Sequence, residues 1–341
     1  MKTDNFIKTC AVIVTYGDRH ALLSQVIFAV INSGVNEIII VDNNSSENSQ
    51  ELFNSINNKN IIIVHFENNT GSANGFLAGI REAKNKTDCE FIWLLDDDNK
   101  PRYDALNILK KFWSELKHPN KEERVSLISF RKDRQLYLKA IEENNPRIVL
   151  GKDNIFRSFH IYNIFQGIYD KVFNNKKKIK NNIKNDYMEM HVGPYGGMFF
   201  NRKLIETIGY PNKKYYLYVD DHEYTYRIIK NGGKIYLVLK SIVEDIDQSW
   251  SVVSSGFAFS RIAKDTNYVK LYYSIRNRLY FEKTELVNNW IVYLLNLSIY
   301  SFFVLCVALI NGNLKNIKVY FTAISHGLLG KMGKNNNYIL Q

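Results

Sequence analysis

Cysteine is scarce in this sequence of 341 residues, which contains only Cys10, Cys89 and Cys306. The three are far apart and form no CxxC pair, which argues against a disulfide framework or a zinc site and is typical of a reducing compartment. Residues 1–10 are polar and contain no apolar stretch. We therefore expect no secretory signal peptide.

Signatures of nucleic-acid-binding domains are also missing. The chain is basic, with 45 Lys and Arg against 34 Asp and Glu and a net charge of +11, which fits nucleic acid, acidic lipid or a phosphorylated substrate as partner. No helix-turn-helix, zinc-finger or RRM pattern occurs, so nucleic acid is the least expected of these. Hydrophobic residues make up 45% of the chain, as in globular proteins with one large domain or two smaller ones.

Short apolar runs alternate with helical patterns in the first hundred residues. The expected strands are residues 10–14, 37–41, 61–66 and 91–95, and helical patterns separate them. This alternation predicts βαβ units with a parallel sheet. The polar strand ends should then line up along one edge of that sheet, where α/β proteins bind their ligands.

The last of these strands runs directly into Asp96, Asp97 and Asp98. Side chains alternate along a strand, so Asp96 and Asp98 share one face and Asp97 takes the other. Two carboxylates aimed together suit Mg²⁺ or Mn²⁺, which keeps positions open for phosphate oxygens. The alternative is an acidic turn that caps the helix after Pro101, and the triplet alone does not decide between them.

Polar residues at the other strand ends fit a nucleotide. Asp42 would accept hydrogen bonds from a base or ribose, or else form an Asx turn or helix cap. The loop at residues 68–75, NNTGSANG, opens a helix whose N-terminus favours phosphate, although it is neither a GxGxxG nor a Walker A loop. Its glycines also fit close helix packing. Tyr16 would stack on a base or fill the edge of the core.

A second acidic pair, Asp220 and Asp221, precedes a predicted helix that ends at Gly232-Gly233. The helix dipole favours an ionised carboxylate at Asp221, and such a group can take a proton from a hydroxyl. The alternative is that either residue merely caps the helix.

Four blocks, in this order, resemble family 2 glycosyltransferases with a GT-A fold: residues 14–16 (VTY), 41–45 (VDNNS), 69–75 (NTGSANG) and 96–98 (DDD). The resemblance covers roughly residues 8–281 and is greatest to bacterial rhamnosyl- and galactofuranosyltransferases of surface polysaccharides. It implies an α/β fold, a GT-A Rossmann-like mixed sheet flanked by helices, with a helical C-terminal region. It also implies transfer of galactofuranose or rhamnose from a UDP- or dTDP-linked donor to a hydroxyl of a lipid-linked glycan, with inversion.

The resemblance assigns roles to particular residues. Asp221 is the implied catalytic base, and Gly196, Gly197 and Asp220 are expected on the acceptor side. Asp96 and Asp98 are implied to hold Mn²⁺ or Mg²⁺, with Asp98 the direct ligand. The residues expected to bind the donor are Thr15, Tyr16, Asp42, Asn69, Gly71, Asp96, Asp97 and Arg276.

The chain departs from the family after the strand at 234–239, where many relatives have a metal-binding histidine. No histidine lies between His222 and His326. We expect Glu244, or Asp245, to supply the third ligand because these metals accept oxygen. The arginines of residues 272–278 (YYSIRNR) match the family and would steady a diphosphate, or only cover a helix surface.

The C-terminal region lacks negative charge. Residues 290–310 are uncharged and long enough to span a bilayer, and no acidic residue follows Glu285, whereas four lysines do. Spanning would place those lysines outside the cell, against the positive-inside bias. We therefore expect helices that lie on the inner face of the cell membrane, near anionic headgroups. A buried helical pair or a homo-oligomer interface is a nearly equal alternative.

These patterns divide the chain into three parts: a nucleotide-sugar-binding half at 1–120, an acceptor-binding and catalytic half at 121–284, and a membrane-associating tail at 285–341. The basic run at 174–185 is expected to be a solvated loop. Two other functions stay open. A sugar-phosphate nucleotidyltransferase should carry a Gly-rich basic loop where residues 16–19 (YGDR) stand, and a non-catalytic membrane-bound partner would not need the acidic residues.

Overall fold

The computed structural model describes residues 7–55, 59–162, 186–247 and 258–339, so the basic run at 174–185 lies outside the described residues. The elements of the first half are β1 (Thr9–Gly17), α1 (His20–Asn32), β2 (Glu37–Ser45), α2 (Glu47–Ser55), β3 (Ile61–Phe66), α3 (Ser72–Lys86), β4 (Phe91–Asp96), β5 (Asn99–Pro101), α4 (Ala105–Glu115), α5 (Lys121–Arg124), β6 (Val125–Phe130) and α6 (Gln135–Glu143). Those of the second half are β7 (Tyr187–Met190), β8 (Met198–Asn201), α8 (Leu204–Ile208), the 3-10 helix η2 (Lys213–Tyr215), α9 (Asp220–Lys230), β9 (Lys234–Asp245), α10 (Ala258–Lys264), α11 (Tyr268–Glu285), α12 (Trp290–Ile310) and α13 (Leu314–Leu329).

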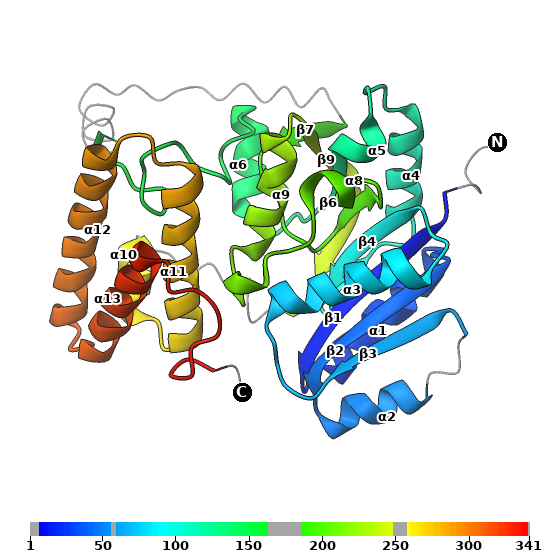
Figure 1. The fold of residues 1–341 in the computed structure, drawn as a ribbon, viewed down its shortest axis with the longest axis horizontal. Coiled ribbons are helices and arrows are strands. Elements are labelled where there is room, and N and C mark those ends of the chain that lie inside the picture. The colour runs from blue at the N-terminus through cyan, green and yellow to red at the C-terminus, as the bar shows by residue number, and fades with distance from the viewer. Residues whose placement is uncertain (1–6, 56–58, 163–185, 248–257, 340–341) are drawn as a thin grey trace.

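A mixed sheet organises the chain up to β9, with strand order β3-β2-β1-β4-β8-β6-β9-β5 and β7 paired to β9 (Figure 1). β1 runs parallel to β2 and β4, whereas β8 is antiparallel to β4 and β6. In this register Thr15 lies beside Asp42, and Val14 lies beside Asp96. The polar ends of the first strands therefore meet at one edge, as the sequence predicted.

Helices cover both faces of the sheet because its central strands are apolar on both sides. On one face Val12 belongs to a core that α3, α6, α8 and α9 complete, for example with Phe76 and Tyr224. On the other face Ile13 packs with α1, α2 and α4, which contribute side chains such as Leu23. The predicted α/β class, a mixed GT-A-type sheet flanked by helices, is confirmed.

Helices α10 to α13 form a separate bundle beside the sheet, which we call the helical unit (Figure 1). Its core is rich in buried tyrosines: Tyr272, Tyr273, Tyr293, Tyr300 and Tyr320. Within the described residues, α12 is the one helix long and apolar enough to cross a membrane. One face of α12 nevertheless packs into this core, and the predicted helical C-terminal region is confirmed.

Candidate active site

Asp97 locks the end of β4 to the end of β1. Thr15 Oγ1 donates to Asp97 Oδ2 at 2.8 Å, and Arg19 Nε donates to Asp97 Oδ1 at 2.8 Å. Asp97 is buried, whereas Asp96 and Asp98 are partly accessible. Asp97 is therefore a fixed part of the sheet edge, whereas the predicted sharing of one face by Asp96 and Asp98 stays a prediction.

Arg19 binds three carboxylates, and the sequence analysis did not select it. Besides Asp97, its guanidinium contacts Asp98 Oδ2 through Nη2 at 3.1 Å and Asp247 Oδ2 through Nη1 at 2.7 Å. It also lies over the Tyr16 ring, 5.5 Å from its centroid. Its place in the loop directly after the first strand was the available signal. Asp247 and Asp98 therefore lie next to the same guanidinium group.

The Asp96 carboxyl accepts no hydrogen bond from any residue that the structure describes. Desolvation and then the charge of Asp98 raise the pKa of Asp96 to about 8. Asp98 Oδ1 accepts a hydrogen bond from Asn99 Nδ2 at 2.9 Å. Two carboxylates that repel each other at a strand end, one of them without a donor, form an oxygen-rich site that a divalent cation would stabilise.

The structure does not bring Glu244 to this pair. Glu244 is half-exposed and pairs with Arg102 Nε at 2.9 Å. Its neighbour Asp245 lies opposite Asn99 in the β5–β9 ladder and binds Asn99, Arg131 and Arg134. Among the residues described, no group of three or more potential His, Cys, Asp or Glu ligands is gathered for a metal. Asp247 shares Arg19 with Asp98, whereas Glu244 pairs with Arg102.

Asp42 is fully buried at the end of β2. Its Oδ1 accepts from Ser45 N at 2.8 Å, and its Oδ2 accepts from Gln50 Nε2 at 2.5 Å and contacts His65 Nδ1 at 2.6 Å. The carboxylate thus fixes the turn after β2 and orients a half-exposed histidine. Its predicted contact with a nucleoside stays a prediction.

Asn43 holds the loop that precedes α3. Its Oδ1 accepts from Thr70 N at 2.8 Å, and its Nδ2 donates to Asn69 Oδ1 at 3.2 Å and to Gly71 O at 3.1 Å. Gly71 has φ +80°, and a Cβ there would lie 2.1 Å from Tyr216 O, so only glycine fits. The predicted loop of Asn69 and Gly71 is therefore rigid.

The start of α3 touches the start of α9. Ala73 N donates to Tyr216 O at 3.2 Å, and Ser72 Oγ donates to Asp220 Oδ2 at 2.9 Å. Asp220 is buried, and burial followed by the charge of Asp221 raises the pKa of Asp220 well above its ordinary value. Asp96 also acts on this pKa. The two acidic pairs predicted from sequence therefore lie within electrostatic range of each other.

Asp221 is more open than Asp220. Its Oδ1 accepts a hydrogen bond from His222 N at 2.8 Å, and the residue is partly exposed. Burial raises the pKa of the nearby Tyr137 phenol, and the charges that act on this phenol include Arg131, Asp221 and Asp245. Asp221 therefore lies within electrostatic range of Tyr137, as do Arg131, which follows β6, and Asp245 at the end of β9.

Gly196 and Gly197 pack beneath that edge. A Cβ on Gly196 would lie 1.9 Å from Asn99 Oδ1, and Gly197 N donates to Leu94 O at 2.8 Å. The glycines let β8 approach the end of β4 closely, which explains why they are needed. Their predicted role on the acceptor side stays a prediction.

Arg276 lies in α11 of the helical unit, and not in the sheet whose strand ends carry Asp42 and Asp96. It is buried in the helical unit, with its guanidinium 5.2 Å and 4.7 Å from the ring centroids of Tyr272 and Tyr273. Its Nη2 donates to Tyr215 O at 3.2 Å. The described contacts of Arg276 are therefore with the helical unit and Tyr215, and its predicted part in donor binding stays a prediction.

A cavity of about 300 Å³ lies between α9 and the α11–α12 turn, where Arg147, His191, Tyr226 and Glu285 line it. None of the acidic residues at the end of β4 or the start of α9 lines this cavity. Arg147 instead pairs with Asp153 at 2.6 Å. We assign the cavity no part in the site.

Residues 10–119 match the family model described as glycosyl transferase family 2. This region is therefore similar to family 2 glycosyltransferase domains. It contains β1 to α4, and with them Asp42, the Asn69–Gly71 loop and the acidic residues after β4. No protein of curated function shows a significant sequence match to the chain.

The solved structures that match the chain have low sequence identity to it. GalNAc-T7 with UDP, GalNAc and Mn²⁺ is 13% identical with a TM-score of 0.48, and the match covers 71% of this chain and 44% of that chain. S. aureus TarS 1–349 with UDP is 13% identical with a TM-score of 0.45, covering 87% and 70%. A second TarS 1–349 structure has a TM-score of 0.44 at 13% identity and covers 95% and 92%. The chain thus spans less than half of the GalNAc-T7 chain, and similarity at this level identifies no substrate.

Proposed function

We propose that the protein is an inverting, metal-dependent glycosyltransferase, and that it moves galactofuranose or rhamnose from a nucleoside diphosphate to a glycan hydroxyl. The observation that carries the proposal is that the two acidic pairs lie within electrostatic range of each other. Asp96 ends β4 and Asp98 follows it, Asp220 and Asp221 begin α9, and the charge of Asp96 is among those that raise the pKa of Asp220. The Ser72–Asp220 hydrogen bond of 2.9 Å joins α9 to the start of α3. A donor held at the first pair would present its anomeric carbon toward the second.

Asp221 is the group we assign to take the proton from the acceptor hydroxyl. It lies in the first turn of α9, where the helix dipole favours the ionised carboxylate. Direct attack by that hydroxyl on the face opposite the departing diphosphate inverts the anomeric carbon and needs only this one base. Asp220, which is bound to Ser72, orients the start of α9.

Asp96 and Asp98 are the residues that would hold Mg²⁺ or Mn²⁺, because oxygen ligands suit both ions and the Asp96 carboxyl is without a donor in the described structure. A bound divalent cation would offset the negative charge that builds on the departing diphosphate. Arg19, which already contacts Asp98, would orient that carboxylate and add positive charge beside the phosphates.

Substitutions of Asp247 and Glu244 are expected to change the affinity for metal to different extents. We expect Asp247→Asn to raise the Kd for Mn²⁺ in the presence of UDP by about ten-fold, as for residues that orient or provide a metal ligand. Glu244→Gln, on the opposite side of β9, should change it by less than about two-fold, as for an exposed ion pair. Isothermal calorimetry measures both. A larger effect of Glu244→Gln than of Asp247→Asn would contradict this and support Glu244 as the metal ligand.

The donor is expected to be UDP- or dTDP-linked, with its nucleoside along the ends of β1 and β2 and its diphosphate near the start of α3. Asn43 fixes the Asn69–Gly71 loop there, and the N-terminus of a 15-residue helix carries partial positive charge. A thermal-shift screen of UDP- and dTDP-sugars with and without Mn²⁺ tests this. Stabilisation by one of them only when Mn²⁺ is present is the expected result. Stabilisation by a nucleoside triphosphate and a sugar phosphate instead would favour a nucleotidyltransferase.

The acceptor is proposed to be lipid-linked, with the enzyme on the inner face of the cell membrane. The outer side of α12 exposes large apolar side chains: Ile291 (82%), Phe302 (61%), Leu309 (54%) and Ile310 (84%). Its inner side is tied down, since Asn296 Nδ2 donates to Asn154 O at 2.9 Å and Ser301 Oγ lies 2.9 Å from Tyr320 Oη. These contacts favour a helix that lies on the bilayer over one that leaves the protein to span it.

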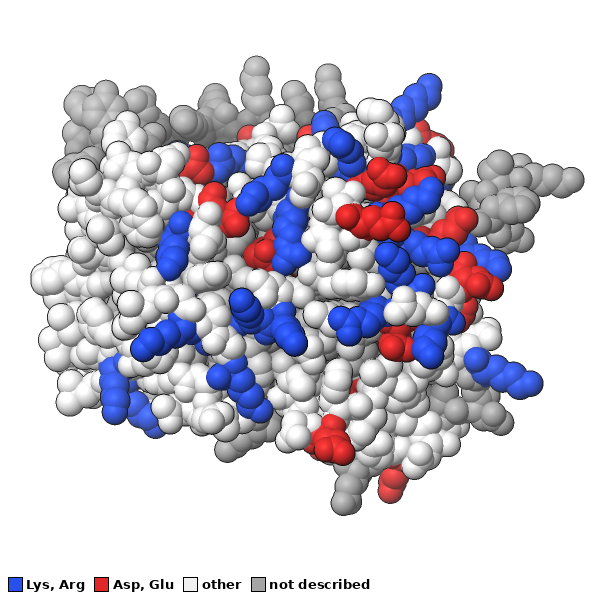
Figure 2. All heavy atoms as spheres, viewed as in Figure 1, with Lys and Arg blue, Asp and Glu red and all other residues white. Residues whose placement is uncertain are grey.

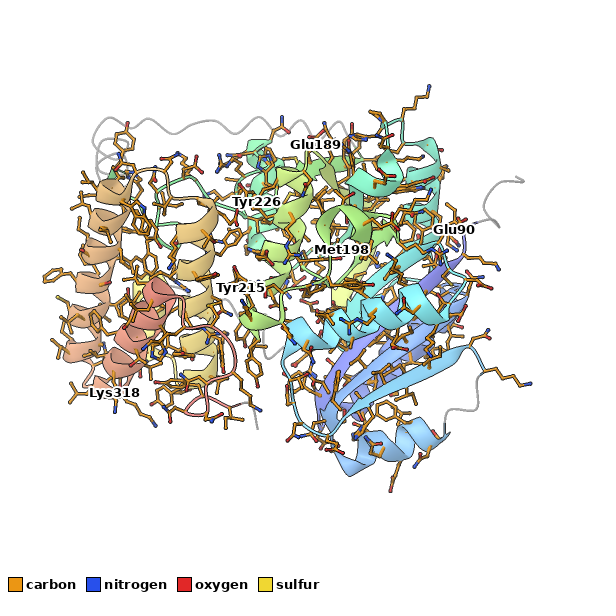
Figure 3. The ribbon with its side chains drawn as sticks, viewed as in Figure 1. Glu90, Glu189, Met198, Tyr215, Tyr226 and Lys318 are labelled. Carbon is orange, nitrogen blue, oxygen red and sulfur yellow. The ribbon has the colours of Figure 1, made fainter. Side chains whose placement is uncertain are left out.

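Charge around α12 fits an anionic bilayer. Over the lower left of the molecule, where α12 ends and α13 begins, Figure 2 shows Lys and Arg side chains without Asp or Glu. Lys318 lies at this end (Figure 3), next to the exposed Leu314. Lysines beside apolar side chains are typical of interfacial helices on acidic lipid.

Phe302→Glu is expected to lower binding to vesicles of phosphatidylglycerol and phosphatidylcholine by about ten-fold or more. The substitution removes an exposed aromatic side chain that would be buried in the bilayer on binding. Phe28→Glu, at a residue 69% exposed on α1, is the matched control and should bind like the wild type. Vesicle cosedimentation measures both. Equal binding by both variants would contradict the proposal, and a dimer that forms without lipid and is lost in Phe302→Glu would assign this face to a second copy.

A further inference from the structure

The loop between η2 and α9 has an unusual backbone. Tyr216, Tyr218 and Val219 have φ values of 66°, 65° and 65°, in the left-handed region that residues other than glycine rarely adopt. A β-branched residue such as Val219 is especially unfavourable there. Such a conformation persists only where the surrounding structure holds it, and Asp220 and Asp221 follow directly.

Asn277 of α11 provides that support. It is fully buried, and its Nδ2 donates to three carbonyl oxygens of the loop: Tyr215 at 2.8 Å, Leu217 at 2.7 Å and Tyr218 at 2.9 Å. Figure 3 shows Tyr215 at the boundary between α9 and the helical unit. The two N–H groups of this amide are therefore shared among three carbonyl oxygens, so that one of the hydrogens is bifurcated.

Arg276 fixes the amide of Asn277. Arg276 Nε donates to Asn277 Oδ1 at 2.9 Å, which orients the Nδ2 group toward the loop. Its Nη1 donates to Gly333 O at 2.6 Å, which ties this arrangement to the chain after α13. The two residues act together, and they explain the Arg-Asn pair of the sequence without any contact to a ligand.

The opposite side of the loop is held by the region that matches the family model. Tyr216 O accepts from Ala73 N at 3.2 Å, and Asp220 accepts from Ser72. The loop is therefore clamped between the start of α3, which belongs to the proposed donor site, and α11, which belongs to the helical unit. Movement of α11 would move the start of α9.

We propose that Asn277 is a positioning residue, which sets Asp221 at the distance and angle from the acceptor hydroxyl that proton transfer requires. The helical unit then contributes to catalysis through Asn277 and Arg276, besides any contact with membrane. This inference rests on the proposed function of Asp221 as the base. It concerns the arrangement of the loop and requires no contact between Asn277 and substrate.

The test compares Asn277→Leu with Asn316→Leu in the full-length chain. Asn316 is a matched control because it is also buried in the helical unit and its Nδ2 donates to two carbonyls, Ile262 O at 2.9 Å and Asp265 O at 2.8 Å, away from the loop. We expect the two substitutions to lower Tm similarly. Asn277→Leu should lower kcat by about 10²-fold with donor Kd unchanged, the effect of a misplaced catalytic group.

Hydrogen exchange at residues 215–221 supplies a readout that does not depend on activity. It should become faster in Asn277→Leu and stay unchanged in Asn316→Leu. Equal kcat in the two variants, or exchange unchanged by Asn277→Leu, would overturn the proposal. If the wild type proves to have no transferase activity, the proposed function fails while faster exchange still confirms that Asn277 holds the loop. Should Asn277→Leu not fold, Asn277→Ser gives the same comparison.

Discussion

Replacing Asp221 with Asn is expected to lower kcat by about 10²–10⁴-fold, the usual contribution of a general base. Asparagine has nearly the same size and still accepts the hydrogen bond from His222 N, so the start of α9 should keep its structure. Donor affinity should hardly change, because Asp96, Asp98 and the Asn69–Gly71 loop are untouched. Initial rates and donor Kd by calorimetry measure the two effects separately.

Asp220→Asn is the matched control for that experiment. Burial raises the pKa of Asp220 well above its ordinary value, so the residue favours its neutral form, which asparagine imitates. Its bond with Ser72 Oγ can be kept through the amide oxygen. Loss of activity in Asp220→Asn with near-normal kcat in Asp221→Asn would reverse the two roles. Equal loss of donor binding in both would place the pair in the donor site.

Replacing Asp98 with Ala is expected to abolish turnover and to remove the dependence of donor binding on Mn²⁺. The fold should survive, because Arg19 keeps its contacts of 2.8 Å with Asp97 and 2.7 Å with Asp247. Loss of one charged ligand among two leaves too few protein oxygens for Mg²⁺ or Mn²⁺ beside a diphosphate. Calorimetry of UDP with and without Mn²⁺, together with circular dichroism, separates loss of metal from loss of fold.

Asp104→Ala is the control for Asp98→Ala. Asp104 precedes α4 and makes no side-chain capping bond, so its removal changes the local charge without disturbing a contact at the site. It should retain wild-type turnover. Full activity of the wild type in excess EDTA, or metal-dependent binding retained by Asp98→Ala, would contradict the metal assignment.

The sheet and the order of its ligand-binding loops could be predicted because each depends on local pattern. Apolar runs that end in polar residues specify buried strands and their ends, and Asp96 and Asp98 are expected to share a face by simple alternation. Topology then brings Asp42 and Asp96 to the ends of the two strands that flank β1. Little more than periodicity was needed for this part of the site.

Long-range contacts could not be predicted in the same way. Whether Glu244 or Asp245 faces the site depends on the register of β9 against β5, which places Asp245 opposite Asn99. Arg19 meets Asp247 only because that register brings residues 228 positions apart together. Arg276 was expected at a diphosphate because a charged side chain in a matching block suggests an anion, yet its described partners are backbone carbonyls, the Asn277 side chain and tyrosine rings.

The apolar run at 290–310 illustrates a limit of composition. Its length and lack of charge fit a membrane span, a core helix or an interface equally well. Only the packing of Tyr293, Asn296 and Tyr300 against the rest of the helical unit distinguishes the two sides of α12. A deletion of residues 286–341, the simplest test from sequence, would expose this core, so substitutions on the outer side are the better experiment.

The most direct measurement of the central claim is analysis of the product by NMR. Full-length enzyme, UDP-galactofuranose or dTDP-rhamnose, Mn²⁺ and a lipid extract as acceptor are incubated together, and the anomeric configuration of the new linkage is determined. The account predicts release of the nucleoside diphosphate and a product whose anomeric configuration is opposite to that of the donor, formed only with the divalent cation. A product that retains the donor configuration, or equal yield in EDTA, would contradict it.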